Sequence, residues 1–152
     1  MHTMQLIQNS SFKFNILVED DAVFDEKFVH KLKNGLKQLP NNYDMLFIAT
    51  CCDFHIKKTL IEPGKLIYEK CREKTSWGGA GATRGMGGVL ISKECSKQIY
   101  EFFKLTEMIN LPVDWWMNDV IRDLKLNVYW MEPVIIKQGS ITGKFKSSLR
   151  IV

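Results

Sequence analysis

Short apolar runs alternate with amphipathic segments from early in this chain, and that order limits the folds open to it. The run at 12–18 is rich in β-branched and aromatic residues, which predicts a strand. Apolar residues then recur at a near four-residue spacing over 28–39, as on one face of a helix, before a second buried strand at 43–49. A strand, helix, strand order favours a parallel sheet with helices packed over it.

The rest of the chain continues the alternation. After an amphipathic piece at 4–9 and the segments above, we expect strands at 65–68, 89–92, 127–130 and 134–137, and helices over 93–104 and 114–124. The chain has 152 residues, enough for one substantial core, and it contains no internal repeat. Residues 1–152 therefore predict a single α/β domain in which parallel pairing of strands prevails.

Charge narrows the class of protein. The net charge is +4, and the basic residues are spread along the chain rather than gathered in the stripe of a nucleic-acid binder. We therefore expect no nucleic-acid partner. The nearest approach to a basic cluster is near the C-terminus, at Lys137, Lys144, Lys146 and Arg150. These residues would meet an anionic ligand or a membrane surface, or they belong to a solvated tail.

The cysteines and the N-terminal residues indicate the cellular compartment that we expect for this protein. The four cysteines, Cys51, Cys52, Cys71 and Cys95, form no CxxC pair and are typical of buried thiols in a reducing compartment. Zinc at Cys51-Cys52 and His55 is the weaker alternative, since no second ligand pair follows. The N-terminus lacks the pattern of a signal peptide, and no run approaches the ~20 apolar residues of a membrane span. We expect a cytoplasmic protein, with peripheral membrane contact as an option.

Three consecutive acids follow the first strand. Side chains alternate along a strand, so Glu19 and Asp21 point to one side and Asp20 to the other. Two carboxylates at the carboxyl edge of a sheet, where α/β proteins bind ligands, suit a hard divalent cation. The alternative is that the acids only begin the loop to the next helix and favour its N-terminus.

A carboxylate flanked by indoles forms a second candidate site, at Asp114, Trp115 and Trp116. Apolar sugar faces stack on aromatic rings while sugar hydroxyls need acceptors. In a partly dry site, Asp114 would deprotonate an acceptor hydroxyl. The alternative is an N-cap aspartate followed by two core tryptophans.

A glycine-rich loop spans 77–88 and contains Arg84. It matches neither GxGxxG nor a P-loop, so its glycines are better explained by tight turns close to a ligand. Arg84 would reach a phosphate or a carboxylate there, or remain an exposed surface arginine.

Several segments in order resemble glycosyltransferase family 25, which includes lipopolysaccharide-type and collagen galactosyltransferases. The resemblance covers roughly 12–148 and is carried by Ile16-Leu17-Val18-Glu19-Asp20-Asp21, Tyr43-Asp44-Met45-Leu46-Phe47, Gly87-Gly88-Val89-Leu90-Ile91-Ser92-Lys93-Glu94, Pro112-Val113-Asp114, Glu132-Pro133 and Lys137-Gln138-Gly139-Ser140. It implies a GT-A-like, Rossmann-related fold with a mixed, mainly parallel sheet flanked by helices. Family members carry a nucleotide-binding strand and loop before the acidic strand. Only about fifteen residues precede that strand here, so we expect an N-terminally shortened form.

The resemblance also implies an activity: metal-assisted transfer of a galactose-like hexose from a UDP-sugar to a saccharide acceptor, with inversion. A cation, Mn²⁺ or Mg²⁺, would lie on Glu19 and Asp21, and Asp114 would be the catalytic base. The remaining candidate donor- and substrate-binding residues are Asp20, Arg84, Gly87, Gly88, Trp115 and Trp116. The alternative is a truncated, non-catalytic relative or partner subunit that binds glycan or protein, with another segment or chain supplying the nucleotide half.

Overall fold

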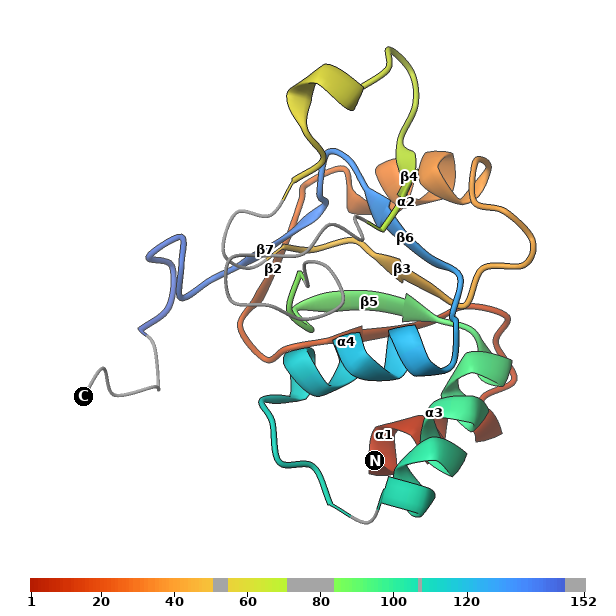
Figure 1. Ribbon diagram of the computed structural model, residues 1–152. Coiled ribbons are helices and arrows are strands. Elements are labelled where there is room, and N and C mark those ends of the chain that lie inside the picture. The colour runs from red at the N-terminus through yellow and green to blue at the C-terminus, as the bar shows by residue number, and fades with distance from the viewer. Residues whose placement is uncertain (51–54, 71–83, 107, 147–152) are drawn as a thin grey trace.

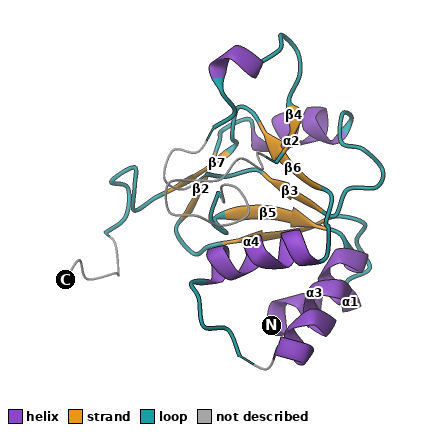
Figure 2. Cartoon of the chain, viewed as in Figure 1, coloured by secondary structure: helices purple, strands orange, loops and turns teal. Residues whose placement is uncertain are grey.

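The structure is a computed structural model that describes residues 1–50, 55–70, 84–106 and 108–146 (Figure 1). Helices and strands are both present throughout these residues (Figure 2). The helices are α1 (His2–Asn9), α2 (Phe28–Leu36), α3 (Lys93–Thr106) and α4 (Val113–Asp123), with a 3₁₀ turn η1 (Lys58–Leu60). The strands are β1 (Asn15–Val18), β2 (Ala22–Phe24), β3 (Met45–Phe47), β4 (Ile67–Glu69), β5 (Gly88–Ile91), β6 (Val128–Met131) and β7 (Ile136–Gln138).

The main sheet is mixed. Its strands lie in the order β1-β5-β3-β6-β4, and β2 pairs with β7 in a separate ribbon. Among the described strands, β3 and β6 form the one parallel ladder, whereas β1 with β5, β3 with β5, β4 with β6 and β2 with β7 are antiparallel. The mixed α/β architecture is confirmed, but the prediction of a mainly parallel sheet is wrong.

Strand β5 is the reason for the difference. Leu17 of β1 and Phe47 of β3 both lie opposite Val89 of β5. Strands β1 and β3 therefore run in the same direction, as the strand, helix, strand order predicts, but β5 lies between them in the opposite direction. A short buried run such as 88–91 has the same apolar pattern in either direction, so its sequence does not indicate which one it takes.

Gly88 allows β5 to occupy this central position. A Cβ added at Gly88 would lie 3.0 Å from both the Cβ of Ala49 and the Cδ1 of Ile136, closer than most such contacts. Every residue of β5 is buried, so the neighbours have little room to move away. A larger residue here would overpack the centre of the sheet.

Helices cover both faces of the main sheet (Figure 1). One face presents Phe47, Val89 and Trp130 to a core shared with α1, α3 and α4. The other face presents Leu46 and Met131 to a second core shared with α2. Successive side chains of β3 thus enter different cores, and this places β3 in the middle of three layers.

Helix α2 packs closely on the sheet. Its side chains Phe28, Leu32 and Leu36 contact the second core, which confirms the helix face predicted from their spacing. A Cβ added at Gly35 would lie 3.1 Å from the Cε of Met131, so a glycine is what lets the helix approach this near. The helix ends at Leu36, earlier than the predicted limit of 39.

Cys95 in α3 is fully buried in the first core. Burial, and to a smaller extent the Asp44 carboxylate, raises the pKa of its thiol. Cys95 is therefore the small buried thiol that the sequence predicts. The other cysteines, and with them the cysteine half of the zinc alternative, lie outside the described residues.

Candidate functional site

The ends of several strands meet at one edge of the main sheet. Val18 of β1 pairs with Gly88 of β5, and β3 and β6 are parallel, so the carboxyl ends of β1, β3 and β6 lie beside the amino end of β5. In Figure 1 this edge is on the left of the view, where β5 and α4 both begin. The chain leaving these strand ends carries the acids 19–21, His55 and Glu132.

Glu19 is an acid at this edge whose pKa is raised. Its carboxyl is partly buried, and burial is the main cause that raises its pKa. The carboxylates of Asp21, Asp20 and Asp114 raise the pKa further. A Cβ added at Gly87 would lie 3.7 Å from Glu19 Oε2. The structure thus brings the first acidic run, the start of β5 and the beginning of α4 to one place.

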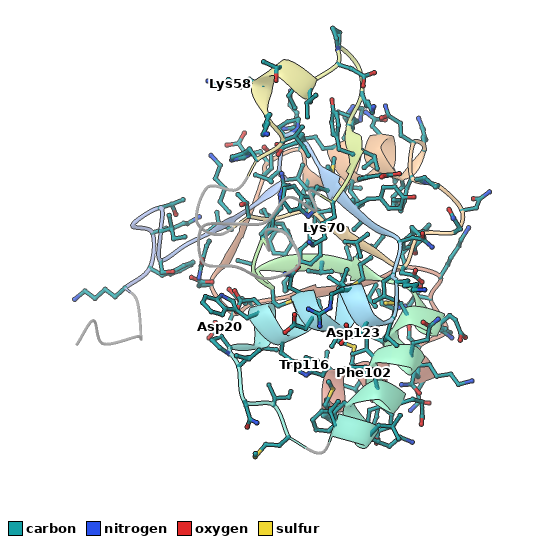
Figure 3. All side chains as sticks on the ribbon, viewed as in Figure 1. Asp20, Lys58, Lys70, Phe102, Trp116 and Asp123 are labelled. Carbon is teal, nitrogen blue, oxygen red and sulfur yellow. The ribbon has the colours of Figure 1, made fainter. Side chains whose placement is uncertain are left out.

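Asp21 already has hydrogen-bond partners. Its Oδ2 accepts a hydrogen bond from the hydroxyl of Ser140 at 2.6 Å and one from the Ser140 backbone N–H at 3.1 Å. The hydroxyl bond is the main reason that the pKa of Asp21 is lowered. The Gly139 N–H also donates to the Asp21 carbonyl at 2.8 Å. Asp21 therefore attaches the segment after β7 to the turn after β1, where Asp20 is exposed (Figure 3).

Asp114 lies in the first turn of α4, which begins at Val113. Pro112 occupies the N-cap position, so the expectation that Asp114 is the N-cap is not met. A carboxylate in a first turn interacts favourably with the positive end of the helix dipole. The same position brings Asp114 within electrostatic range of Glu19.

The two tryptophans after Asp114 have different surroundings. Trp115 is 47% exposed, which leaves part of its ring accessible at the start of α4. Trp116 is buried and packs against Phe102 and Phe103 of α3 at centroid distances of 6.5 and 6.3 Å (Figure 3). Trp116 thus agrees with the core alternative, whereas Trp115 lies partly at the surface.

Arg84 is fully buried, unlike the exposed or ligand-facing arginine that the sequence suggests. Its Nη2 donates to the carboxylate of Glu132, and its Nη1 donates to the Met131 carbonyl at 2.9 Å. The guanidinium also stacks over Trp130, 4.3 Å from a ring centroid. Burial lowers the pKa of Arg84, and the Glu132 carboxylate opposes that change. Arg84 thus meets a carboxylate, but one that belongs to the protein.

Glu132 also accepts hydrogen bonds from the segment after β3. The Nδ1 of His55 lies 3.0 and 3.1 Å from its two carboxylate oxygens, and the Ile56 N–H donates to Oε1 at 3.1 Å. The resemblance singled out Glu132 only as part of a matching segment, and it gave the residue no role. A signal was present: Glu132 directly follows a largely buried strand, at the sheet edge where α/β proteins generally bind ligands.

The acidic site contains too few preformed ligands for a metal ion by itself. Within residues 1–50, 55–70, 84–106 and 108–146, no group of three or more His, Cys, Asp or Glu side chains is positioned to hold a metal. Mg²⁺-type sites, however, often use one or two carboxylates and complete the shell with substrate phosphates and water. Glu19, with Asp21 beside it, fits that description.

Other expected features fall partly outside the described residues. Most of the glycine-rich loop, 77–83, and Arg150 belong to the part that is not described, while Lys137, Lys144 and Lys146 are exposed. In the described residues, none of the helices has both the length and the apolar character needed to cross a bilayer.

No protein-family model matches the sequence, and no curated protein matches it.

The raised pKa of Glu19 should make the stability of the fold depend on pH. Its pKa in the folded state lies above its ordinary value of 4.5, so the folded protein binds the proton more tightly than the unfolded chain. Stability is therefore lost as pH rises from 4.5 through the folded-state pKa. We expect Glu19→Gln to raise the free energy of unfolding at pH 7, with the gain disappearing toward pH 4, in urea denaturation followed at several pH values. A Glu26→Gln control, at an exposed acid, should show no such pH dependence, and a pH-independent effect of Glu19→Gln would contradict the assignment.

The buried ion pair of Arg84 and Glu132 should contribute to the stability of the fold. Glu132→Ala leaves a buried guanidinium without its carboxylate, which typically costs about 3–5 kcal/mol in free energy of unfolding. Replacing both residues, as Arg84→Met with Glu132→Leu, should recover much of that loss because no unpaired charge remains. Glu62→Ala, which breaks an exposed pair with Lys65, serves as the control and should change little. Equal small losses in urea denaturation for Glu132→Ala and Glu62→Ala would show that the buried pair is not needed.

Proposed function

We propose that this protein is a metal-assisted glycosyltransferase that moves a galactose-like hexose from a UDP-sugar to a saccharide hydroxyl. One observation supports it most: Glu19 at the end of β1 and Asp114 at the start of α4 lie within electrostatic range of each other at the carboxyl edge of the sheet. This edge is where open α/β sheets bind their ligands. The resemblance to glycosyltransferase family 25 assigns the same two residues to metal and acceptor. A GT-A-like fold belongs to the same proposal, and helices on both sheet faces support it.

Glu19 would provide the main protein ligand for Mn²⁺ or Mg²⁺. Its raised pKa reflects burial and crowding by other carboxylates, and a divalent cation would relieve that repulsion. Asp21 would be the second acid, held in orientation by Ser140 as ligating carboxylates usually are held by neighbours. A cation here would neutralise the diphosphate that leaves when the glycosidic bond breaks.

Asp114 would act on the acceptor. In the proposed step, the acceptor hydroxyl oxygen attacks the anomeric carbon from the face opposite the nucleotide, and its proton passes to the Asp114 carboxylate. The bond between the anomeric carbon and the UDP phosphate oxygen breaks, and UDP takes the electron pair. The exposed ring of Trp115 would stack on a sugar face next to that carboxylate. This assignment requires no movement of Trp116 out of the core.

A second candidate is a non-catalytic glycan- or protein-binding subunit with the same fold. The burial of Arg84 favours it, because this arginine is committed to Glu132 and Trp130 rather than turned toward a phosphate. Either candidate is a cytosolic protein in our proposal, with any membrane contact peripheral.

Calorimetry and turnover separate the two candidates. We expect UDP to bind only with Mn²⁺ present. We expect Glu19→Gln to abolish this metal-dependent binding. Asp114→Asn should keep UDP binding but lower UDP-galactose turnover about 100-fold or more, the usual contribution of a general base. Asp119→Asn is the matched control, since Asp119 is on the same helix and pairs with Arg122 at the surface.

The outcomes are distinct. Binding of UDP without turnover in the wild type would favour the non-catalytic subunit. Absence of any metal-dependent UDP binding, or equal turnover in Asp114→Asn and the Asp119→Asn control, would rule out the mechanism proposed for these residues.

A further inference from the structure

Strand β1 is a terminal strand of the main sheet in the described chain, and it leaves apolar side chains uncovered. Ile16 and Val18 are 38% and 37% exposed, and Phe14 and Phe12 just before them are 37% and 72% exposed. Side chains two residues apart in extended chain point to the same face, so Phe14, Ile16 and Val18 form one apolar row, which we name the β1 row. The chain bends at Lys13, and Phe12 lies beyond that bend. Helix α2 covers this sheet face farther along, at β3 and β6, but not at β1.

The surface next to the uncovered edge is hollowed. A hollow of about 360 Å³ lies between α1 and the start of β1, with Leu6 and Phe12 among its lining residues. An edge strand presents unpaired backbone N–H and C=O groups that serve as a template for another strand. Proteins usually protect such edges with charges, prolines or a covering segment, and the β1 row has none of these within it.

The opposite face of β1 carries charges at its two ends. Leu17 packs against the first core. Lys13 lies at the bend before β1, and Glu19 directly follows β1, each an even number of residues from Leu17. Lys13 is exposed, with its ammonium 5.3 Å from the ring centroid of Phe14. Glu19 lies in an environment crowded with acids. The strand is therefore basic where it begins and acidic where it ends.

We propose that β1 pairs antiparallel with β1 of a second copy of this chain, in a symmetric dimer centred on Ile16. In this register Ile16 lies opposite its own copy at the two-fold axis. Phe14 lies opposite Val18 of the other copy, and Lys13 lies opposite Glu19. Both pairs occur twice, as a two-fold axis requires.

The sequence selects this register among its neighbours. A shift by one residue would turn the β1 row to the wrong face. A shift by two in one direction places Lys13 opposite the apolar Leu17, and a shift in the other direction places Phe14 opposite Asp20. Only the register centred on Ile16 pairs apolar with apolar residues and opposite charges together, and both kinds of cross-strand pair are favourable.

The dimer also fills the hollow. When strands pair antiparallel, the end of β1 in one copy lies beside the start of β1 in the other. Val18 of the second copy then adds its side chain beside Phe14, at the border of the hollow that Leu6 and Phe12 line. The edge gains backbone partners and the β1 row becomes continuous across two molecules. The interface shares Glu19 with the proposed cation site, but its test is the oligomeric state, which is measured without transferase activity.

Light scattering and analytical ultracentrifugation test the interface. We expect the wild-type chain to be a dimer and Ile16→Lys to be a monomer, because the substitution places two ammonium groups face to face at the axis. Leu60→Lys, at a residue of η1 that is 59% exposed, is the control and should stay dimeric. A monomeric wild type would overturn the proposal, and so would a dimer that persists in Ile16→Lys.

Cross-linking tests the register. Directly opposed residues of antiparallel strands have Cα atoms about 4.5–5.5 Å apart, within the span of a disulfide. Ile16→Cys should therefore form a covalent dimer under mild oxidation, beyond any seen for the wild type or Leu60→Cys. If Ile16→Cys cross-links no more than these controls, the register centred on Ile16 is wrong.

A charge exchange tests the end pairs. Lys13→Glu alone and Glu19→Lys alone should each weaken the dimer roughly tenfold, since each change affects two pairs. The double variant, Lys13→Glu with Glu19→Lys, should return the dissociation constant toward the wild-type value. A double variant weaker than both single variants would contradict the proposed contact between Lys13 and Glu19.

Discussion

The position of β5 is the constraint on which the rest of the structure depends. Because β5 runs antiparallel between β1 and β3, its amino end lies with the carboxyl ends of its neighbours. Gly88 permits this by leaving space for Ala49 and Ile136 beside a fully buried strand. One edge of the sheet consequently receives the chain that enters β5 and the chain that leaves β1, β3 and β6. The acids after β1 meet the first turn of α4 there, and Glu132 meets Arg84.

Charges at this edge are arranged in two ways. Arg84 and Glu132 are buried and joined to each other, and Trp130, the Met131 carbonyl and the donors from His55 and Ile56 complete their surroundings. Removing one member of such a pair lowers the free energy of unfolding strongly, because the other charge stays buried without a partner. Glu19, by contrast, has a pKa raised mainly by burial and further by the carboxylates of Asp21, Asp20 and Asp114. The first arrangement stabilises the fold, whereas the second is suited to binding a positively charged ligand.

Local patterns predicted the elements well, and long-range pairing poorly. Spacing of apolar residues located α2, α3, α4 and most strands, since each of these elements buries a regular face. The direction of β5 was not predictable, because a fully buried strand has the same pattern either way. For the site, the sequence correctly placed Glu19 directly after a strand. No local pattern shows that Asp114 lies within electrostatic range of Glu19 or that Arg84 is paired with Glu132. Those contacts join residues that are 95 and 48 positions apart and depend on the sheet order.

In the function we propose, this edge binds a divalent cation together with a nucleotide diphosphate. Anomalous scattering from crystals grown with Mn²⁺ and UDP tests this binding most directly. We expect one manganese peak about 2.0–2.6 Å from a carboxylate oxygen of Glu19, the range of bonds between hard cations and oxygen, with UDP phosphates completing its shell. A nucleotide bound without manganese at Glu19, or manganese bound at a different place, would contradict it.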